Sequence, residues 1–188
     1  MSTLTNTDLQ RVLKERVATY PDFPKPGVNF KDIQSILSSP QISREVLLNS
    51  YEVILKNNPS LDAIVGFDAR GFLFGTSLAI EFDIPFILAR KANKLPGELV
   101  TVSFEKEYGP DTLSVQKGLI VPGMKVLIHD DLLATGGTAL AAVDLVKKEG
   151  GIVSGFHFII ELGYLGGREK IEQHGKVLSM VRYETSEE

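Results

Sequence analysis

The chain has 188 residues, of which 43% are hydrophobic and 23% are charged, and this composition is typical of one globular domain with a single core. It contains no cysteine and three histidines, which excludes disulfides and thiol catalysis and leaves too few nitrogen ligands for a zinc site. The net charge of -4 gives no electrostatic footprint for nucleic acid or an anionic membrane, so an anionic ligand needs local donors.

Two helices are predicted in the first third of the chain. The first spans residues 7–20, because Thr7 and Gln10 fit a capping box and apolar residues recur on one face. It is predicted to end there because three prolines follow in PDFPKPG. The second spans residues 39–57, with Pro40 in its first turn. Both are interpreted as packing elements.

From residue 63 onward, short apolar runs alternate with helical segments. The runs predict strands at 63–67, 85–89, 125–129, 152–160 and 176–183. Helices are predicted between them at 71–82, 138–149 and 168–172. Apolar strands separated by helices indicate an α/β fold, in which a central, mostly parallel sheet is covered by helices on both faces. Ligands of such sheets bind beyond the carboxyl ends of the strands.

Residues 92–118 break this pattern. The stretches on either side of residues 108–111 alternate between apolar and polar side chains, which predicts an antiparallel hairpin that projects from the sheet. Long excursions of this kind are often active-site lids, and an ordinary surface hairpin is the alternative. No repeat or linker interrupts the sequence, so we expect residues 1–188 to form a single domain.

The segment Val126–Thr138 carries the strongest chemical signal, because it combines a strand, two carboxylates, a glycine-rich loop and a helix start. The loop consists of Ala134, Thr135, Gly136, Gly137 and Thr138. Its glycines let main-chain amides converge, its threonines add hydroxyl donors, and the following helix presents its positive end. These features predict a cradle for a phosphate monoester. Neither the Walker A nor the Rossmann glycine motif is present.

Asp130 and Asp131 stand immediately before this loop. Carboxylates readily accept hydrogen bonds from a vicinal diol, so the two carboxylates and the cradle together fit a ribose 5-phosphate. The alternatives are an acidic pair that binds a cation, or a polar turn that caps a helix. The glycine-rich loop directly after the pair favours the sugar phosphate.

The segment VLIHDDLLATGGT resembles the phosphoribosyl-pyrophosphate signature of the type I phosphoribosyltransferases. Four further segments are similar to the adenine phosphoribosyltransferases of that family, at 21–33, 66–75, 90–98 and 105–109. They follow the family's order, so the resemblance spans about residues 20–175. It implies the type I phosphoribosyltransferase fold and a purine-salvage reaction in which adenine and 5-phosphoribosyl-1-pyrophosphate give AMP and pyrophosphate.

The resemblance assigns pyrophosphate binding to Asp68, Ala69, Arg70, Arg90, Lys91 and Lys94. An arginine and free amides at a helix start suit a pyrophosphate, and the strand at 63–67 delivers Arg70 at such a place. The family comparison also allows a cis peptide between Asp68 and Ala69. Many relatives carry a small hydroxyl residue at the position of Ala69, so only main-chain contact is expected there. Solvated surface charge is the alternative reading of these cations.

The resemblance places adenine between Phe30, which stacks on one face, and Leu132, which packs on the other. Main-chain groups of Asn29 and Lys31 read the edge of the base. A 6-oxo purine would leave such groups unpaired at about 1–3 kcal/mol each. Taken from the residues alone, Phe30 would more often be a core aromatic. Some relatives have arginine where this chain has Lys31, which matters little if only the main chain is used.

Glu107 and Tyr108 precede the turn of the hairpin. The resemblance makes Glu107 the candidate acid/base beside the imidazole nitrogens of the purine, with a solvated surface glutamate as the alternative. Asp130 and Asp131 complete the candidate catalytic set, since carboxylates stabilise an oxocarbenium-like transition state. We expect displacement at C1′ with inversion. Mg²⁺ is expected to be carried mainly by substrate oxygens, with no dedicated protein site.

The resemblance also sets expectations for organisation and partners. It divides the domain into an N-terminal helix with the base-binding turn at about 1–35 and a lid hairpin at about 92–118. We expect a homodimer that is cytoplasmic, contacts neither nucleic acid nor membrane, and binds adenine, phosphoribosyl pyrophosphate and AMP. Two alternatives stay open: the base is hypoxanthine, guanine, xanthine or orotate, or the chain is a regulator of the same fold without turnover.

Overall fold

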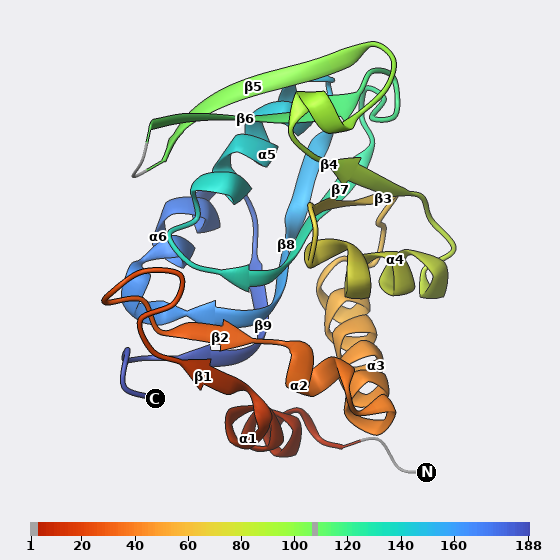
Figure 1. The fold of residues 1–188 in the computed structure, drawn as a ribbon. Helices are drawn as coiled ribbons and strands as arrows, with labels where there is room; N and C mark the ends of the chain where they lie inside the picture. Colours follow the sequence, from red (N-terminus) through yellow and green to blue (C-terminus); the bar gives the residue numbers. More distant parts are fainter. Residues whose placement is uncertain (1–3, 107–108) are drawn as a thin grey trace.

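A five-stranded parallel sheet with the order β4-β3-β7-β8-β9 forms the centre of the computed structural model, which describes residues 4–106 and 109–188 (Figure 1). The strands are β3 (Ala63–Phe67), β4 (Phe86–Ala89), β7 (Lys125–Leu133), β8 (Ile152–Leu162) and β9 (Val177–Tyr183). All four pairings are parallel, which confirms the predicted sheet. The chain adds β4 on one side of β3 and β7 on the other, and ligands of parallel sheets bind at such a reversal.

Strand β7 continues beyond the predicted end at residue 129. Asp130 pairs with Phe158 and Leu132 with Ile160, so the acidic pair lies within the strand and not after it. The prediction of the strand end was wrong because carboxylates are depleted in isolated strands. Here the long apolar β8 offers hydrogen-bond partners to the main chain of these residues, and buried main-chain groups need such partners.

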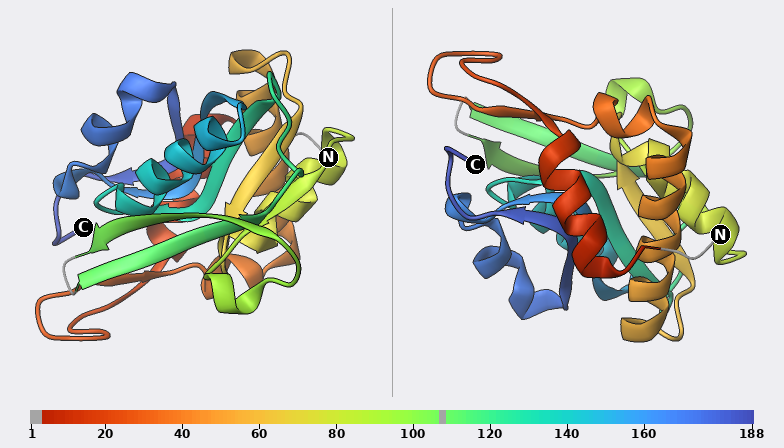
Figure 2. Two further views of the ribbon diagram at one scale, coloured as in Figure 1. Left: turned by 90° about the horizontal axis from the view of Figure 1, so that it is seen from above. Right: turned by 90° about the horizontal axis from the view of Figure 1, so that it is seen from below.

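Helices cover both faces of the sheet (Figures 1 and 2). One face carries α1 (Asn6–Arg16), α3 (Pro40–Asn57) and α4 (Gly71–Glu81), with the short α2 (Gln34–Leu37) beside them, and the other carries α5 (Gly137–Lys148) and α6 (Gly167–Ile171). Neighbouring residues of one strand therefore enter different cores: Val65 packs with α5 and Ile64 with α3 and α4. Both faces are buried, which explains the uninterrupted apolar runs.

The helices predicted at 39–57, 71–82, 138–149 and 168–172 are confirmed to within one residue at each end. Within the residues that the structure describes, no helix is both long and apolar enough to cross a bilayer.

The first helix is shorter than predicted. Thr5, not Thr7, caps α1, and the helix ends at Arg16. Residues Ala18–Tyr20 form β1, which pairs in antiparallel fashion with β2 (Phe30–Asp32). Threonine and tyrosine favour extended backbone, and pairing with a strand after the proline-rich turn outweighs continuation of the helix.

The predicted hairpin is present as β5 (Leu99–Lys106) and β6 (Gly109–Gln116), and it lies beside α5 (Figure 2). Its base does not stand free of the core. Leu113 and Val115 are buried in the cluster that contains α5, and Ser114 exchanges main-chain hydrogen bonds with Arg90 at 3.0 and 2.8 Å. The hairpin is thus anchored at the end of β4, close to the predicted pyrophosphate residues.

Candidate active site

The carboxyl ends of β3 and β7 lie side by side where the strand order reverses. Gly66 of β3 pairs with His129 of β7, so the segments after these two residues emerge together. The Nε atom of Arg70 lies 3.0 Å from Oδ2 of Asp131 and ties the two segments to each other. The peptide between Asp68 and Ala69 is cis, as the resemblance allowed.

A cavity of about 180 Å³ opens at this reversal. Six of the residues predicted to form the site line this cavity: Asp68, Arg90, Lys91, Lys94, Asp130 and Thr138. The hairpin adds Phe104, Asp111 and Thr112, which the sequence analysis did not single out. The sequence signal for them was weak: Asp111 is the last residue of the predicted turn and Thr112 follows it, but nothing local tells which hairpin side chains face inward.

Carboxylates hold the cations of this cavity in place. Asp68 Oδ2 accepts hydrogen bonds from Lys94 Nζ at 2.8 Å and from Arg90 Nε at 3.2 Å. The bond from Lys94, followed by that from Arg90, holds the pKa of Asp68 below its usual range. Lys91 Nζ lies 3.1 Å from Asp111 Oδ1. The three cations therefore face one cavity in fixed positions, an arrangement suited to an incoming anion with several negative charges.

The acidic pair is largely withdrawn from solvent. Asp131 is 3% exposed, and Asp130 Oδ1 accepts the main-chain amide of Asp131 at 2.9 Å. Burial, followed by the charge of Asp131, raises the pKa of Asp130. Burial also raises the pKa of Asp131, against the opposing effect of Arg70. A half-buried carboxylate beside a buried one favours a ligand that donates hydrogen bonds or develops positive charge.

The raised pKa of Asp130 predicts a pH-dependent gain in stability for Asp130→Asn. A carboxyl whose folded pKa exceeds its unfolded value destabilises the fold once it ionises, and this effect vanishes below the unfolded pKa, near about 4. We expect Asp130→Asn to melt higher at pH 7.5, by about 2–4 °C per kcal/mol recovered. Thermal melts between pH 4 and 8 measure the difference in melting temperature between the variant and the unaltered chain. This difference should disappear as the pH falls. A difference that stays constant over this range contradicts the argument.

Residues 134–138 form the predicted loop between β7 and α5. Gly136 has φ +77°, in the left-handed region that glycine tolerates. The first main-chain bond of α5 runs from the Leu140 amide to the Gly136 carbonyl at 2.9 Å, so the amides just before residue 140 precede the helix's own ladder. They point along the positive end of the helix, as an anion cradle requires. Phosphate binding by this loop stays a prediction.

The start of α6 packs tightly against the same loop. A methyl group at Gly136 would lie 2.8 Å from the Gly167 carbonyl oxygen, and one at Gly167 would lie 2.1 Å from the Ala134 carbonyl oxygen. Both distances are shorter than any van der Waals contact, so only glycine fits at residue 167. The doublet Gly166–Gly167 was visible in the sequence, but its neighbour across the fold was not.

Phe30 reaches the site through Arg70. The Arg70 guanidinium lies 4.9 Å from the centroid of the Phe30 ring, and Phe23 packs edge-on against that ring at 5.2 Å. Leu132, predicted on the opposite face of the base, is partly buried against the core cluster of α1 and β9. The aromatic ring is thus linked through Arg70 to the acidic pair.

The side chains of Asn29 and Lys31 point elsewhere. Asn29 Nδ2 donates to the main-chain oxygen of Ser186 at 2.7 Å, and Lys31 is 1% exposed. These two side chains are therefore engaged away from Phe30, and contact of their main chain with a base stays a prediction. Glu107 and Tyr108 lie outside the described residues.

The family model described as "Phosphoribosyl transferase domain" matches residues 32–178 of the chain. An adenine phosphoribosyltransferase of Rubrobacter xylanophilus is 44% identical over 176 residues, which cover 92% of this chain and 92% of that protein. One of Koribacter versatilis is 42% identical over 184 residues, which cover 98% of this chain and 100% of that protein.

Solved structures agree with these sequence relatives. The adenine phosphoribosyltransferase of Rhodothermus marinus superposes with a TM-score of 0.88 at 39% identity, covering 94% of this chain and 99% of that one. The enzyme of Saccharomyces cerevisiae, complexed with adenine and D-2,5-dideoxy-2,5-imino-altritol 1,6-bisphosphate, superposes with a TM-score of 0.86 at 36% identity, covering 93% and 99%.

Proposed function

The chain belongs to the adenine phosphoribosyltransferase family, and we propose that it makes AMP and pyrophosphate from adenine and 5-phosphoribosyl-1-pyrophosphate by Mg²⁺-dependent displacement at C1′ with inversion. One observation carries the details: at the carboxyl ends of β3 and β7, Arg70 joins Asp131 to the ring of Phe30, and the neighbouring Asp130 lines the same cavity as Arg90, Lys91 and Lys94. The three parts of the reaction, sugar, leaving group and base, thus have neighbouring sites.

The phosphoribosyl group occupies the edge of the sheet. The amides and hydroxyls of residues 134–138 bind the 5′-phosphate, and Asp130 and Asp131 accept hydrogen bonds from the ribose hydroxyls. The pyrophosphate enters the cavity, where Arg90, Lys91 and Lys94 exchange part of their carboxylate contacts for its oxygens. Main-chain groups of residues 68–70 complete its contacts.

The residues of the chain then act on the two changing bonds. Adenine N9 attacks C1′ as the bond from C1′ to the pyrophosphate oxygen breaks. Asp130 and Asp131 stabilise the positive charge that develops on the sugar ring. Glu107 removes a proton from the base in this direction and returns it in the reverse direction. The hairpin, with Tyr108 beside Glu107, closes over the reaction and excludes water that would hydrolyse the activated ribose.

The cavity fits a Mg²⁺ ion that arrives on the substrate. Asp130 offers hard oxygen ligands beside the cations, yet among residues 4–106 and 109–188 no group of three or more His, Asp or Glu could hold a metal alone. Substrate oxygens and water would supply the other ligands. When bound, Mg²⁺ supplies positive charge that neutralises the leaving pyrophosphate.

Main-chain recognition beside Phe30 selects adenine. Phe30 and Leu132 hold the two faces of the base, and the N–H and C=O groups of Asn29 and Lys31 complement its ring acceptor and amino donor. A 6-oxo purine reverses one donor and one acceptor, so each mismatch costs about 1–3 kcal/mol.

Product formation tests this function directly. We expect AMP and pyrophosphate from adenine and phosphoribosyl pyrophosphate with Mg²⁺, and a large loss of rate when EDTA removes the metal. Parallel reactions with hypoxanthine, guanine, xanthine and orotate measure base choice. Faster turnover of any of these bases would refute adenine as the substrate. Binding of AMP without turnover of any base would favour the nucleotide-binding regulator.

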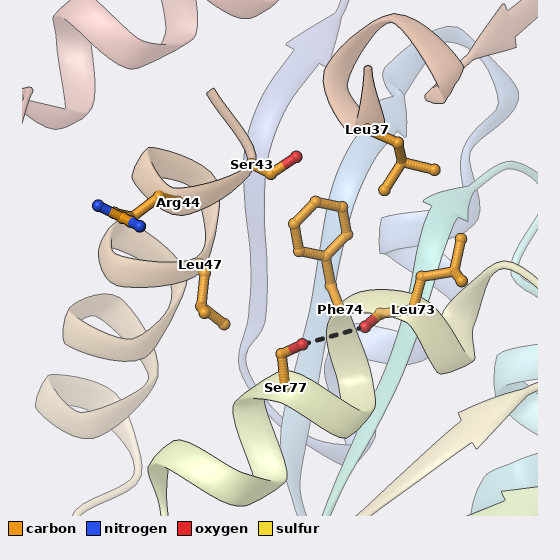
Figure 3. Close-up of a pocket in the computed structure, with 7 residues that line it drawn as sticks. All are labelled: Leu37, Ser43, Arg44, Leu47, Leu73, Phe74 and Ser77. Carbon is orange, nitrogen blue, oxygen red and sulfur yellow. Dashed lines mark hydrogen bonds between the residues drawn. The ribbon is translucent and has the colours of Figure 1, made fainter. Parts of the chain in front are cut away.

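A homodimer is proposed on the apolar surface around α4. Leu73 and Ile80 are 47% and 73% exposed, and a cavity of about 240 Å³ lies between α3 and α4 beside Leu73 and Phe74 (Figure 3). Large exposed apolar side chains next to a groove are typical of a subunit interface. Light scattering should give twice the chain mass of 20.6 kDa, and Ile80→Asp should shift it towards that of one chain. A monomeric unaltered chain contradicts the proposal.

A further inference from the structure

The last residues of the chain contact the base-binding strand. Here Glu184–Glu188 is called the tail segment. The main-chain oxygen of Ser186 accepts from Asn29 Nδ2 at 2.7 Å, and that of Glu188 accepts from Lys31 Nζ. The family match ends at residue 178, before this segment, so the match says nothing about a role for it.

The tail segment has a folded shape of its own. The Glu188 carboxylate accepts the Glu184 amide at 2.7 Å and lies 3.5 Å from Lys14 Nζ of α1. These contacts close the segment on itself and fasten it to the first helix. It therefore presents its main-chain oxygens to β2 in a defined position.

Lys31 is the central contact. Its ammonium group is buried, lies 4.0 Å from the centroid of the Tyr183 ring, and donates to Thr19 Oγ1 at 2.8 Å and to the Glu188 oxygen. A buried ammonium group without partners is strongly unfavourable, so removal of the Glu188 oxygen should disturb how this residue sits. Burial lowers the pKa of Lys31, and the Glu188 carboxylate opposes that effect.

The geometry of the strand links this contact to Phe30, the residue proposed to stack on the base. Successive side chains of a strand point to opposite faces. Asn29 and Lys31 point to the tail segment, while Phe30 between them points to Arg70 and Phe23. Holding the two outer side chains thus fixes the position of the ring and of the main-chain groups on either side.

We propose that the tail segment is a positioning element for adenine: it holds Asn29 and Lys31 so that Phe30 and the neighbouring main-chain groups meet the base. The inference rests on the proposed function. It makes the specific claim that residues distant from the pyrophosphate cavity set the KM for one substrate and not for the other.

Steady-state kinetics on three variants test the proposal: deletion of residues 185–188, Lys31→Met, and the two combined. We expect the deletion to raise the KM for adenine about tenfold, the factor that corresponds to one charge-assisted hydrogen bond. The KM for phosphoribosyl pyrophosphate should stay within about twofold, since Lys91 and Lys94 are untouched. The combined variant should raise the KM for adenine by less than the product of the two single effects, because both changes break the contact between Lys31 and Glu188. Lys31→Arg keeps a charged donor and should restore most of the affinity.

Glu187→Gln, an exposed change within the same segment, is the matched control and should behave as the unaltered chain. Melting temperatures check that the variants are folded. An active deletion variant with an unchanged KM for adenine, or with both KM values raised equally, overturns the positioning role alone. Failure of the unaltered chain to form AMP overturns the proposed function and this inference with it.

Discussion

Asp131→Asn is expected to lower kcat by about 10²- to 10³-fold, the usual effect of removing one preorganised charge from a transition state. Asp131 is buried at the end of β7 and pairs with Arg70, whose guanidinium packs on Phe30. In the proposed function, loss of the carboxylate removes negative charge beside the sugar, and it also removes the ion pair that holds Arg70 against the Phe30 ring. The rate of AMP formation at saturating concentrations of both substrates measures the effect.

The fold should tolerate this change. The Arg70 side chain is 37% exposed, so water can solvate the exposed part of its guanidinium after its partner becomes neutral, although Nη1 is buried. Burial raises the pKa of Asp131, which means that the ionised carboxylate is itself unfavourable there. We therefore expect a melting temperature no lower than that of the unaltered chain. Asp144→Asn, which neutralises an exposed carboxylate on α5, is the control and should keep full activity. Turnover equal to this control would remove Asp131 from the catalytic set.

Local sequence predicts best the elements that are defined by a run of apolar residues, because such runs must be buried. The apolar runs at 63–67 and 152–160 are strands because both faces of a parallel sheet are covered, and the sheet was confirmed. The loop at 134–138 was also visible, since glycines before a helix have few other uses. Roles given by the resemblance, such as that of Glu107, are not local signals and stay predictions.

Contacts between distant segments could not be predicted. Pairing of β1 with β2 ended the first helix early, and nothing before Tyr20 encodes that partner. The contact between His129 and His157 could not be predicted either. Both side chains are fully buried, and their rings stack with centroids 5.1 Å apart. Burial lowers the pKa of each imidazole. Such contacts depend on the register of neighbouring strands, and a sequence pattern gives strand existence more reliably than register.

The packing of α6 on the loop at residues 134–138 leads to the second large effect. Gly167→Ala is expected to lower kcat/KM for phosphoribosyl pyrophosphate by about 10²-fold, the loss that a displacement of about 1 Å causes in a positioned site. The new methyl group would lie 2.1 Å from the Ala134 carbonyl oxygen and 3.0 Å from the Gly136 amide nitrogen. Neither atom belongs to a flexible side chain, so the loop itself must move. Since the proposed function assigns the 5′-phosphate to this loop, the phosphoribosyl substrate should be affected more than adenine.

Gly166→Ala separates this displacement from simple backbone strain. Gly166 has φ +65°, so alanine there costs about 1 kcal/mol, but its methyl group would meet nothing closer than Glu169 Oε2 at 3.7 Å. That variant should lose some thermal stability and keep its kinetics, whereas Gly167→Ala should lose affinity for the phosphoribosyl substrate. If the two alanines behave alike, the loop does not depend on α6 for its shape. If they differ as expected, the close contact of Gly167 with the main chain of Ala134 and Gly136 sets the position of the loop at 134–138, and with it the position of the sugar phosphate in the proposed function.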